Sequence, residues 1–154
     1  MLTPKRSADS LTHHVQIVLP GDLNGYGRLF GGRLMQWIDI VAGVVARRHA
    51  GREVTTASVD HLDFQAAAYV NDTIALEGRI TYVGRTSMEV RVDTYVESLN
   101  GDRRQVNRAY LVLVALDPEN HRPAPVPPLL LETEEDYAEW EAAAQRDKIR
   151  KARR

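Results

Sequence analysis

The strongest constraint on the fold is one helix pattern followed by strand patterns only. In residues 33–50, apolar residues recur at the i, i+4 and i+7 spacing of one helix face, at Leu34, Ile38, Val41 and Val45. Gly51 follows directly and predicts the C-terminal stop, because glycine readily adopts the left-handed conformation found there. A helix with one long apolar face needs a sheet or another helix to cover it.

Strand patterns lie on both sides of this helix. Residues 14–19 alternate Val15, Ile17 and Leu19, which is strand periodicity. After the helix, four segments predict strands: 53–64, 73–83, 88–96 and 105–116. Turn signals separate them at Asn71-Asp72, Gly84 and Asn100-Gly101. Short loops between long strands indicate antiparallel pairing, so we expect a two-layer α+β domain.

The 154 residues fit one folded domain with flanking segments. We expect a loose N-terminal lead-in over 1–12, the folded domain over 13–122, and a Pro-rich linker with a charged C-terminal helix over 123–154. In that last segment Thr133 and Asp136 resemble a capping box, acids come early, and Lys and Arg come late. This pattern predicts a solvated helix.

Composition excludes several classes of function. The formal net charge of -1 provides no global basic field for nucleic acid. The absence of cysteine excludes a thiol nucleophile, a disulfide framework and a Cys-ligated metal. No apolar run approaches the ~20 residues that a transmembrane helix needs. The N-terminus lacks the apolar region of a secretory signal, so we expect a cytoplasmic protein.

The chemistry-bearing stretch is 24–39, NGYGRLFGGRLMQWID. A helix start offers free backbone N–H groups and the positive end of the dipole, and Gly31 and Gly32 let a ligand approach it closely. Asn24 adds a side chain that can donate and accept hydrogen bonds. Asp39 interrupts an apolar segment, and because burying an unpaired carboxylate is costly, it needs a structural partner or a task.

The spacing separates Asp39 from the helix start. Asp39 is about two turns into the helix, some 10 Å along its axis, so it cannot readily meet its own chain's helix start. A second copy of the chain could bring the two together. Each piece also has a structural reading: the Gly pair as a turn, Asn24 as a loop residue, and Asp39 as a partner of Arg47 or Arg48.

Asn24-x-x-Gly27-x-x-Phe30-Gly31-Gly32, followed by Leu34-Met35 and Asp39, resembles the signature of hot-dog-fold acyl-CoA thioesterases. The similarity is greatest to bacterial YciA-type and eukaryotic cytosolic acyl-CoA hydrolases, and covers roughly 14–118. It implies a sheet wrapped around one central helix. It also implies hydrolysis of an acyl-CoA to a carboxylic acid and coenzyme A, with no metal or other cofactor.

The resemblance also implies roles for matching residues. Asn24 and Asp39 would form a catalytic pair across a dimer interface, and Gly31 and Gly32 would hold the thioester carbonyl. The turn Gly84, Arg85, Thr86 and Ser87 matches a segment that contacts coenzyme A. Such dimers assemble further into hexamers or tetramers. The chain departs from the family at Ala67, where Pro is common, and at Asn71, where Gly is common, which puts local loop shape in doubt.

Two other functions stay open. A non-catalytic acyl-CoA sensor is one, although the residues before the first strand are too few for a DNA-binding module. A hot-dog dehydratase or hydratase is the other, because His61 and Asp63 share a strand face as an acid/base pair would. Within the thioesterase reading, Asp39 is either a general base for water or a nucleophile.

Overall fold

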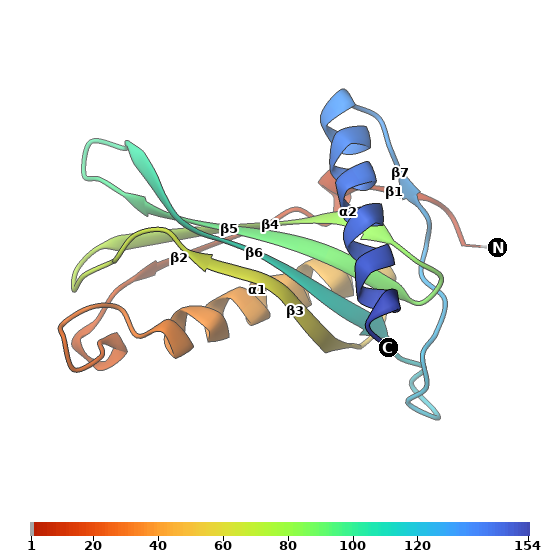
Figure 1. Ribbon diagram of the computed structural model, residues 1–154, viewed down its shortest axis with the longest axis horizontal. Helices are drawn as coiled ribbons and strands as arrows, with labels where there is room; N and C mark the ends of the chain where they lie inside the picture. The colour runs from red at the N-terminus through yellow and green to blue at the C-terminus, as the bar shows by residue number, and fades with distance from the viewer. Residues whose placement is uncertain (1) are drawn as a thin grey trace.

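A five-stranded sheet curves around one long helix in the computed structural model, which describes residues 2–154 (Figure 1). The helix is α1 (Gly31–Ala50), and the strands are β2 (Thr12–Ile17), β3 (Val54–Phe64), β4 (Thr73–Val83), β5 (Ser87–Glu97) and β6 (Arg103–Ala115). Their order is β2-β4-β5-β6-β3, with every neighbouring pair antiparallel. This arrangement confirms the predicted α+β class and the helix wrapped by a sheet.

The core lies between α1 and the inner face of the sheet. The four residues of the predicted helix face are all buried, as are Met88, Val90 and Val92 of β5. Gly78 of β4 allows the close approach, because a Cβ there would lie 2.7 Å from Val41 Cγ1. The helix begins at Gly31, two residues before the predicted start, and Gly51 ends it with φ +68°.

The alternation that predicted the first strand marks its outer face. Val15, Ile17 and Leu19 are 61%, 54% and 57% exposed, whereas Val18 is fully buried against the core. β2 is an edge strand, and α1 covers only its inner side. Period-2 alternation locates a strand without saying which of its two faces is covered.

The N-terminal segment is tied to the domain rather than loose. β1 (Lys5–Arg6) pairs in parallel with β7 (Leu129–Leu130), and a short 3-10 helix follows over Ser7–Asp9. The buried Ser7 hydroxyl donates to the Ile80 carbonyl at 3.1 Å. The expectation of a loose lead-in is therefore wrong over 5–12, while Met1 lies outside the described residues. Such pairing between distant segments leaves no local pattern.

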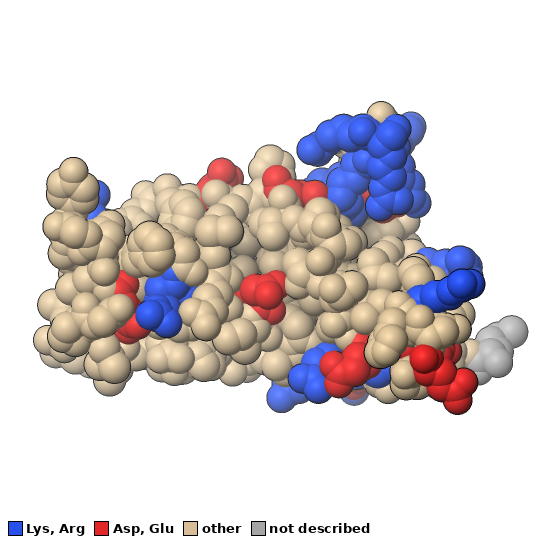
Figure 2. Space-filling view, turned by 90° about the horizontal axis from the view of Figure 1, so that it is seen from below, with Lys and Arg blue, Asp and Glu red and all other residues tan. Residues whose placement is uncertain are grey.

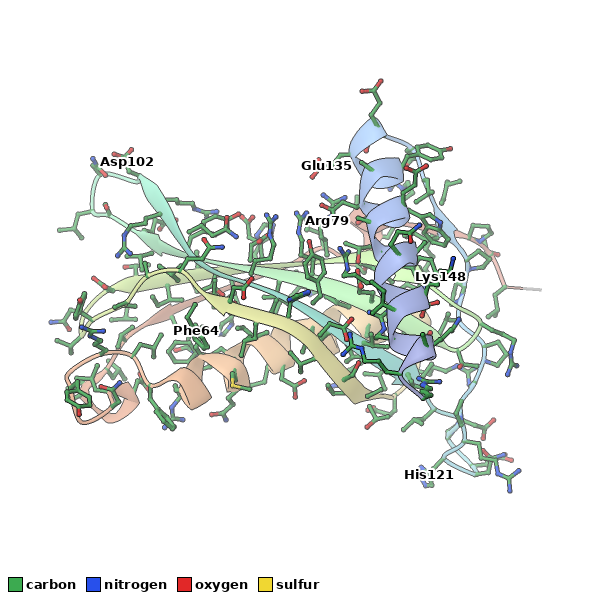
Figure 3. All side chains as sticks on the ribbon, in the orientation of Figure 1. Phe64, Arg79, Asp102, His121, Glu135 and Lys148 are labelled. Atoms are coloured by element: carbon green, nitrogen blue, oxygen red, sulfur yellow. The ribbon has the colours of Figure 1, made fainter. Side chains whose placement is uncertain are left out.

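The C-terminal helix α2 (Glu134–Ala152) packs across the outer face of the sheet, opposite α1 (Figure 1). Its capping box is as predicted, with the Thr133 hydroxyl accepting from the Asp136 N–H at 3.0 Å. Arg79 of β4 forms ion pairs with Glu135 and Asp136 of α2, and Figure 3 shows Arg79 next to Glu135. Trp140 stacks on Tyr82 at a centroid distance of 4.4 Å. The predicted solvated helix is thus a docked one.

Candidate active site

The start of α1 has backbone donors that no protein group uses. Its N-cap residue, Phe30, supplies no side-chain hydrogen bond, and among residues 2–154 no acceptor is placed for the N–H groups of Gly31 and Gly32. A Cβ at Gly32 would lie 2.7 Å from the Phe30 ring, so glycine lets that ring pack over the helix start. Two free N–H groups at the positive end of a helix suit a carbonyl oxygen or an oxyanion.

Asn24 lies in the loop before α1, and its side-chain oxygen is hydrogen-bonded whereas, in the part of the chain that the structure describes, its side-chain nitrogen is not. Its Oδ1 accepts from the backbone N–H groups of Tyr26 at 2.9 Å and Arg28 at 3.2 Å. Gly27 completes this turn with φ +75°, which favours glycine. The oxygen therefore shapes the loop. The side-chain NH₂ has no acceptor among the described residues and is left to donate.

Asn24 and Gly31 share one cavity of about 400 Å³. Phe64 at the end of β3 and Leu34 of α1 give it an apolar lining, and a Cβ at Gly31 would lie 3.5 Å from the Phe64 ring. Figure 3 shows Phe64 between β3 and α1. This cavity presents amide and backbone donors but no carboxylate, so it can bind a carbonyl group and cannot activate water by itself.

Asp39 lines a second cavity of about 340 Å³ with apolar walls that include Met35, Val59 and Leu62. The Thr56 hydroxyl donates to Asp39 Oδ1 at 2.6 Å. Within residues 2–154, Asp39 Oδ2 has no hydrogen-bond or ion-pair partner, so it remains available to a ligand in the cavity. Thr56 is a site residue that the sequence reasoning missed, because a threonine in a Thr-rich strand carries no local signal.

Three expectations about Asp39 need correction. In the single chain it is exposed, not buried in its apolar segment, because it lies on the outer face of α1 while Trp37 and Ile38 beside it face the core. It also shares its cavity with Gly32, two turns back on the same helix face, so one chain does join Asp39 to part of the helix start. Asn24 does not line that cavity. The structural pairing with arginine is wrong too, since Arg47 pairs with Glu53 and Arg48 bonds to Leu11 and Thr12.

Both cavities open on a face rich in exposed apolar side chains. On α1 and at its start these are Phe30, Met35 and Ile40, and on β3 they are Val59 and Phe64, each between 44% and 55% exposed. β3 is also an edge strand of 11 residues, with unpaired backbone groups on its outer side. A face of this kind is suited to a second protein chain.

The turn Gly84–Ser87 lies elsewhere. With the last turns of α2 it lines a cavity of about 450 Å³ on the outer side of the sheet. The structure therefore brings Gly84, Arg85, Thr86 and Ser87 together, but does not join them to Asp39 or Asn24 in one cavity. His61 and Asp63 are exposed on β3 and line none of these cavities, which removes the geometric support for a hydratase pair.

Two searches of residues 2–154 gave negative results. No group of three or more His, Asp or Glu side chains is arranged to hold a metal ion. No helix in that range is both long and apolar enough to cross a membrane.

His49 is buried, with its Nε2 at 2.7 Å from the Pro127 carbonyl oxygen. Burial lowers the pKa of His49, and the hydrogen bond to Pro127 acts in the opposite direction.

A hot-dog sheet with free helix-start donors, an asparagine and a threonine-held aspartate is an arrangement for acyl-group chemistry. The Thioesterase superfamily profile matches residues 26–101. The acyl-CoA thioester hydrolase YkhA of Bacillus subtilis (strain 168) is 43% identical over 138 residues, covering 89% of this chain and 80% of that protein. The human cytosolic acyl coenzyme A thioester hydrolase is 35% identical over 99% of the chain, which spans only 40% of it.

Solved structures agree. A hexameric acyl-CoA thioesterase without ligand superposes with a TM-score of 0.93 at 39% identity, covering 99% of this chain and 97% of that one. An acyl-CoA hydrolase from Staphylococcus aureus, in complex with butyryl coenzyme A and coenzyme A, gives 0.91 at 34% identity, covering 97% and 91%. The chain belongs to the Thioesterase superfamily, and within it to the acyl-CoA thioester hydrolases.

Variants of the S. aureus enzyme have also been solved. In three of them alanine replaces an asparagine, an aspartate or a threonine. These are the residue types found here at Asn24, Asp39 and Thr56.

Proposed function

We propose that this protein hydrolyses an acyl-CoA thioester to a carboxylic acid and coenzyme A at a site shared between two copies of the chain. The observation that carries the proposal is the division of the machinery. Asn24 lies with a free helix-start N–H in one cavity, and Asp39 lies with Thr56 in another. Neither cavity alone holds both Asn24 and the Asp39 carboxylate.

Each side chain has a role that follows from its contacts. The N–H groups of Gly31 and Gly32 polarise the thioester carbonyl and hold the oxyanion that develops on it. The Asn24 NH₂, left free by the loop, donates to the same oxygen or to water. Thr56 fixes the Asp39 carboxylate through Oδ1, so that Oδ2 either takes a proton from the attacking water or attacks the carbonyl carbon itself.

The exposed face around the two cavities supports a dimer. The unpaired edge of β3 and the apolar side chains beside it would be covered by a second copy related by a two-fold axis. Covering this face would also exclude water from Asp39. Relatives described as hexamers support further assembly of such dimers, and a hexamer is our proposal for this chain.

The remaining parts of the proposal concern the substrate and its setting. Arg85, Thr86 and Ser87 would contact the coenzyme A portion. The reaction needs no cofactor beyond the coenzyme A that leaves with the product. A cytoplasmic location is also proposed, supported by mammalian relatives that are named as cytosolic enzymes.

The test is complementation between two inactive variants. Asn24→Ala and Asp39→Ala homo-oligomers should each be nearly inactive toward butyryl-CoA, followed by release of free thiol. Co-expressed mixed dimers should regain activity up to about half the wild-type rate, because one of their two sites then has both native residues.

Purification on two different affinity tags isolates oligomers that contain both variants, and the fraction of mixed dimers within them sets the ceiling on the regained rate. Each variant is checked for native circular dichroism and for the wild-type sedimentation coefficient. Verified mixed dimers that stay as inactive as the parents would contradict a shared site. So would a fully active monomer at the working concentration.

A further inference from the structure

The cavity between the β4–β5 turn and the end of α2 is cationic. About 450 Å³ in volume, it is lined by the Gly84–Ser87 turn, by Ala57 and Ser58 of β3, by Arg150 and Lys151 of α2, and by Arg154, which follows α2. Figure 2 shows Lys and Arg gathered at the corner of the molecule where α2 ends (upper right). One carboxylate, Asp147, lies among the lining residues.

The cations in this cavity are not equally free. Arg150 is only 11% exposed and is held by Asp60 and Glu89, so it belongs to the structure. Lys151 pairs with Asp147 at 2.8 Å, but its side chain is 65% exposed, and such exposed pairs contribute little and exchange readily. Within residues 2–154, Arg85 and Arg154 have no carboxylate within ion-pair distance. The available positive charge is therefore on Arg85, Lys151 and Arg154.

The turn that faces these cations is held rigidly by the backbone. Gly84 N–H donates to the Ser87 carbonyl at 2.9 Å. The Thr86 and Arg85 carbonyls accept from Ala115 and Val126, each at 3.0 Å. A Cβ at Gly84 would lie 2.8 Å from Ser87 Oγ, so glycine leaves room for that hydroxyl. The hydroxyls of Thr86 and Ser87 and the Arg85 guanidinium thus project from a fixed frame.

This chemistry selects a phosphate group. Guanidinium, ammonium and hydroxyl donors converge on one cavity, and phosphate oxygens accept from all three. The negative end of the α2 dipole opposes an anion at this place. A cluster of cations can outweigh it, and that cluster consists of Lys151 in the last turn of α2, Arg154 just beyond it and Arg85 of the β4–β5 turn.

The position along β3 relates this cavity to the reacting centre. Thr56 and Val59 line the cavity of Asp39, and the residues between them, Ala57 and Ser58, line the cationic one. A β-bulge falls within this stretch, where the register with β6 shifts. The two cavities therefore flank the same few residues of the edge strand. At ~3.3 Å per strand residue, the two linings are close enough along β3 for one coenzyme A thioester to span both cavities.

We propose that α2 completes a phosphate site, with Lys151 and Arg154 joining Arg85 in binding the phosphate groups of the coenzyme A nucleotide. The proposal rests on the proposed function for the identity of its ligand. It gives the C-terminal helix a part in substrate binding beyond covering the sheet. Thr86 and Ser87 add hydroxyl donors from the opposite wall.

The test compares Lys151→Gln/Arg154→Gln with wild type on two substrates. One is butyryl-CoA, and the other is butyryl-pantetheine, which has the same thioester but no phosphate. The KM for butyryl-CoA should rise about tenfold with kcat unchanged, because charge-assisted contacts to the phosphates are lost. Hydrolysis of butyryl-pantetheine should stay within about twofold of wild type. Lys148→Gln is the control: it removes one positive charge from an exposed position on α2 that does not line the cavity (Figure 3).

Calorimetry with free coenzyme A separates this inference from the proposed function. Weaker binding in the double variant but not in Lys148→Gln supports the phosphate site, even in a protein that hydrolyses no thioester. Equal coenzyme A affinity in wild type and double variant overturns it, even if butyryl-CoA is hydrolysed. A loss that is equal for both substrates would show that the α2 residues act on the fold, and would also overturn it.

Discussion

Two helices of similar length lie on opposite faces of the same sheet and are attached in different ways. α1 has 20 residues and buries eight of them, of which only His49 is polar. α2 has 19 residues and buries only Ala143. In place of an apolar face, α2 uses ion pairs from Arg79, Arg146 and Arg150 together with the stacking of Trp140 on Tyr82.

The centre of the α2 attachment is Glu89, whose side chain is completely buried. Its carboxylate accepts from Thr81 at 2.6 Å, from Arg146 at 2.8 and 3.0 Å, and from Arg150 at 3.3 Å. Arg146 also stacks over the Tyr110 ring at 3.8 Å. A charge removed from water in this way is tolerated only while its partners remain. α1 is therefore held by the burial of apolar surface, and α2 by a few specific polar and aromatic contacts.

The largest expected effect is on the α2 side. Glu89→Ala leaves Arg146 and Arg150 without their shared carboxylate, and we expect the docking of α2 to weaken by about 3–5 kcal/mol. In a Trp37→Phe background, Trp140 is the only tryptophan and reports α2 alone. Its fluorescence should shift to a solvent-exposed value at a much lower urea concentration than in the parent.

Glu141→Ala is the matched control for that experiment, because Glu141 is exposed on the same helix. It should leave the Trp140 transition where it is in the parent. A Trp140 transition that Glu89→Ala does not move would show that stacking and the other ion pairs hold α2, and that the buried carboxylate does not.

The corresponding change on the α1 side is Ile38→Ala. Ile38 is 1% exposed, and truncating it should lower the free energy of unfolding by about 2–4 kcal/mol through lost burial and a residual cavity. The fluorescence of Trp37, measured in a Trp140→Phe background, and that of Trp140 should shift together, because α2 docks on a sheet that this core supports. A shift in only one of the two signals would contradict the asymmetry between the helices.

The same asymmetry decides how much of the fold could be predicted. Apolar burial leaves a periodic pattern, so α1, the five strands of the main sheet and the stop at Gly51 were located to within about two residues. The docking of α2 was missed because Arg146 and Glu89 are 57 residues apart and carry no periodicity. β1 was missed for a related reason: a two-residue strand pairs with β7 across the whole chain.

The residues of the candidate site also differ in how far a local sequence pattern predicts them. Asn24, the glycine pair and Asp39 could be proposed from the sequence because they lie in one continuous motif. Thr56 was not, since its contact with Asp39 depends on how β3 passes α1. The exposure of Asp39 was also unpredicted, because sequence neighbours that are apolar need not cover a side chain on the outer face of a helix. The assigned roles of these residues stay predictions.

The next largest expected effect is on catalytic activity. Asp39→Asn, which is nearly isosteric, should lower kcat for butyryl-CoA at least about tenfold, equivalent to ~1.4 kcal/mol of barrier, with unchanged circular dichroism. Glu141→Gln makes the same acid-to-amide change on α2 and should leave kcat unaffected. Full activity in Asp39→Asn would remove Asp39 from the chemistry and leave α1 with a structural role only.

The smallest expected effect concerns the start of α2 in acid. Burial acts to raise the pKa of the Asp136 carboxyl, but hydrogen bonds from Glu132, Thr133 and Arg79 outweigh it and hold that pKa below 3.8. Because the folded-state pKa is depressed, the stabilisation is fully present above 3.8 and is lost as the pH falls below that value. Asp136→Asn should cost α2 about 1 kcal/mol at pH 7, as the loss of a helix cap does. That difference from wild type, measured by Trp140 fluorescence in urea, should shrink as the pH falls below 3.8.

A difference that stays constant into acid would mean that geometry, not the Asp136 charge, holds the first turn of α2. An effect that appears equally in Trp37 fluorescence would mean that α1 and α2 unfold as one unit.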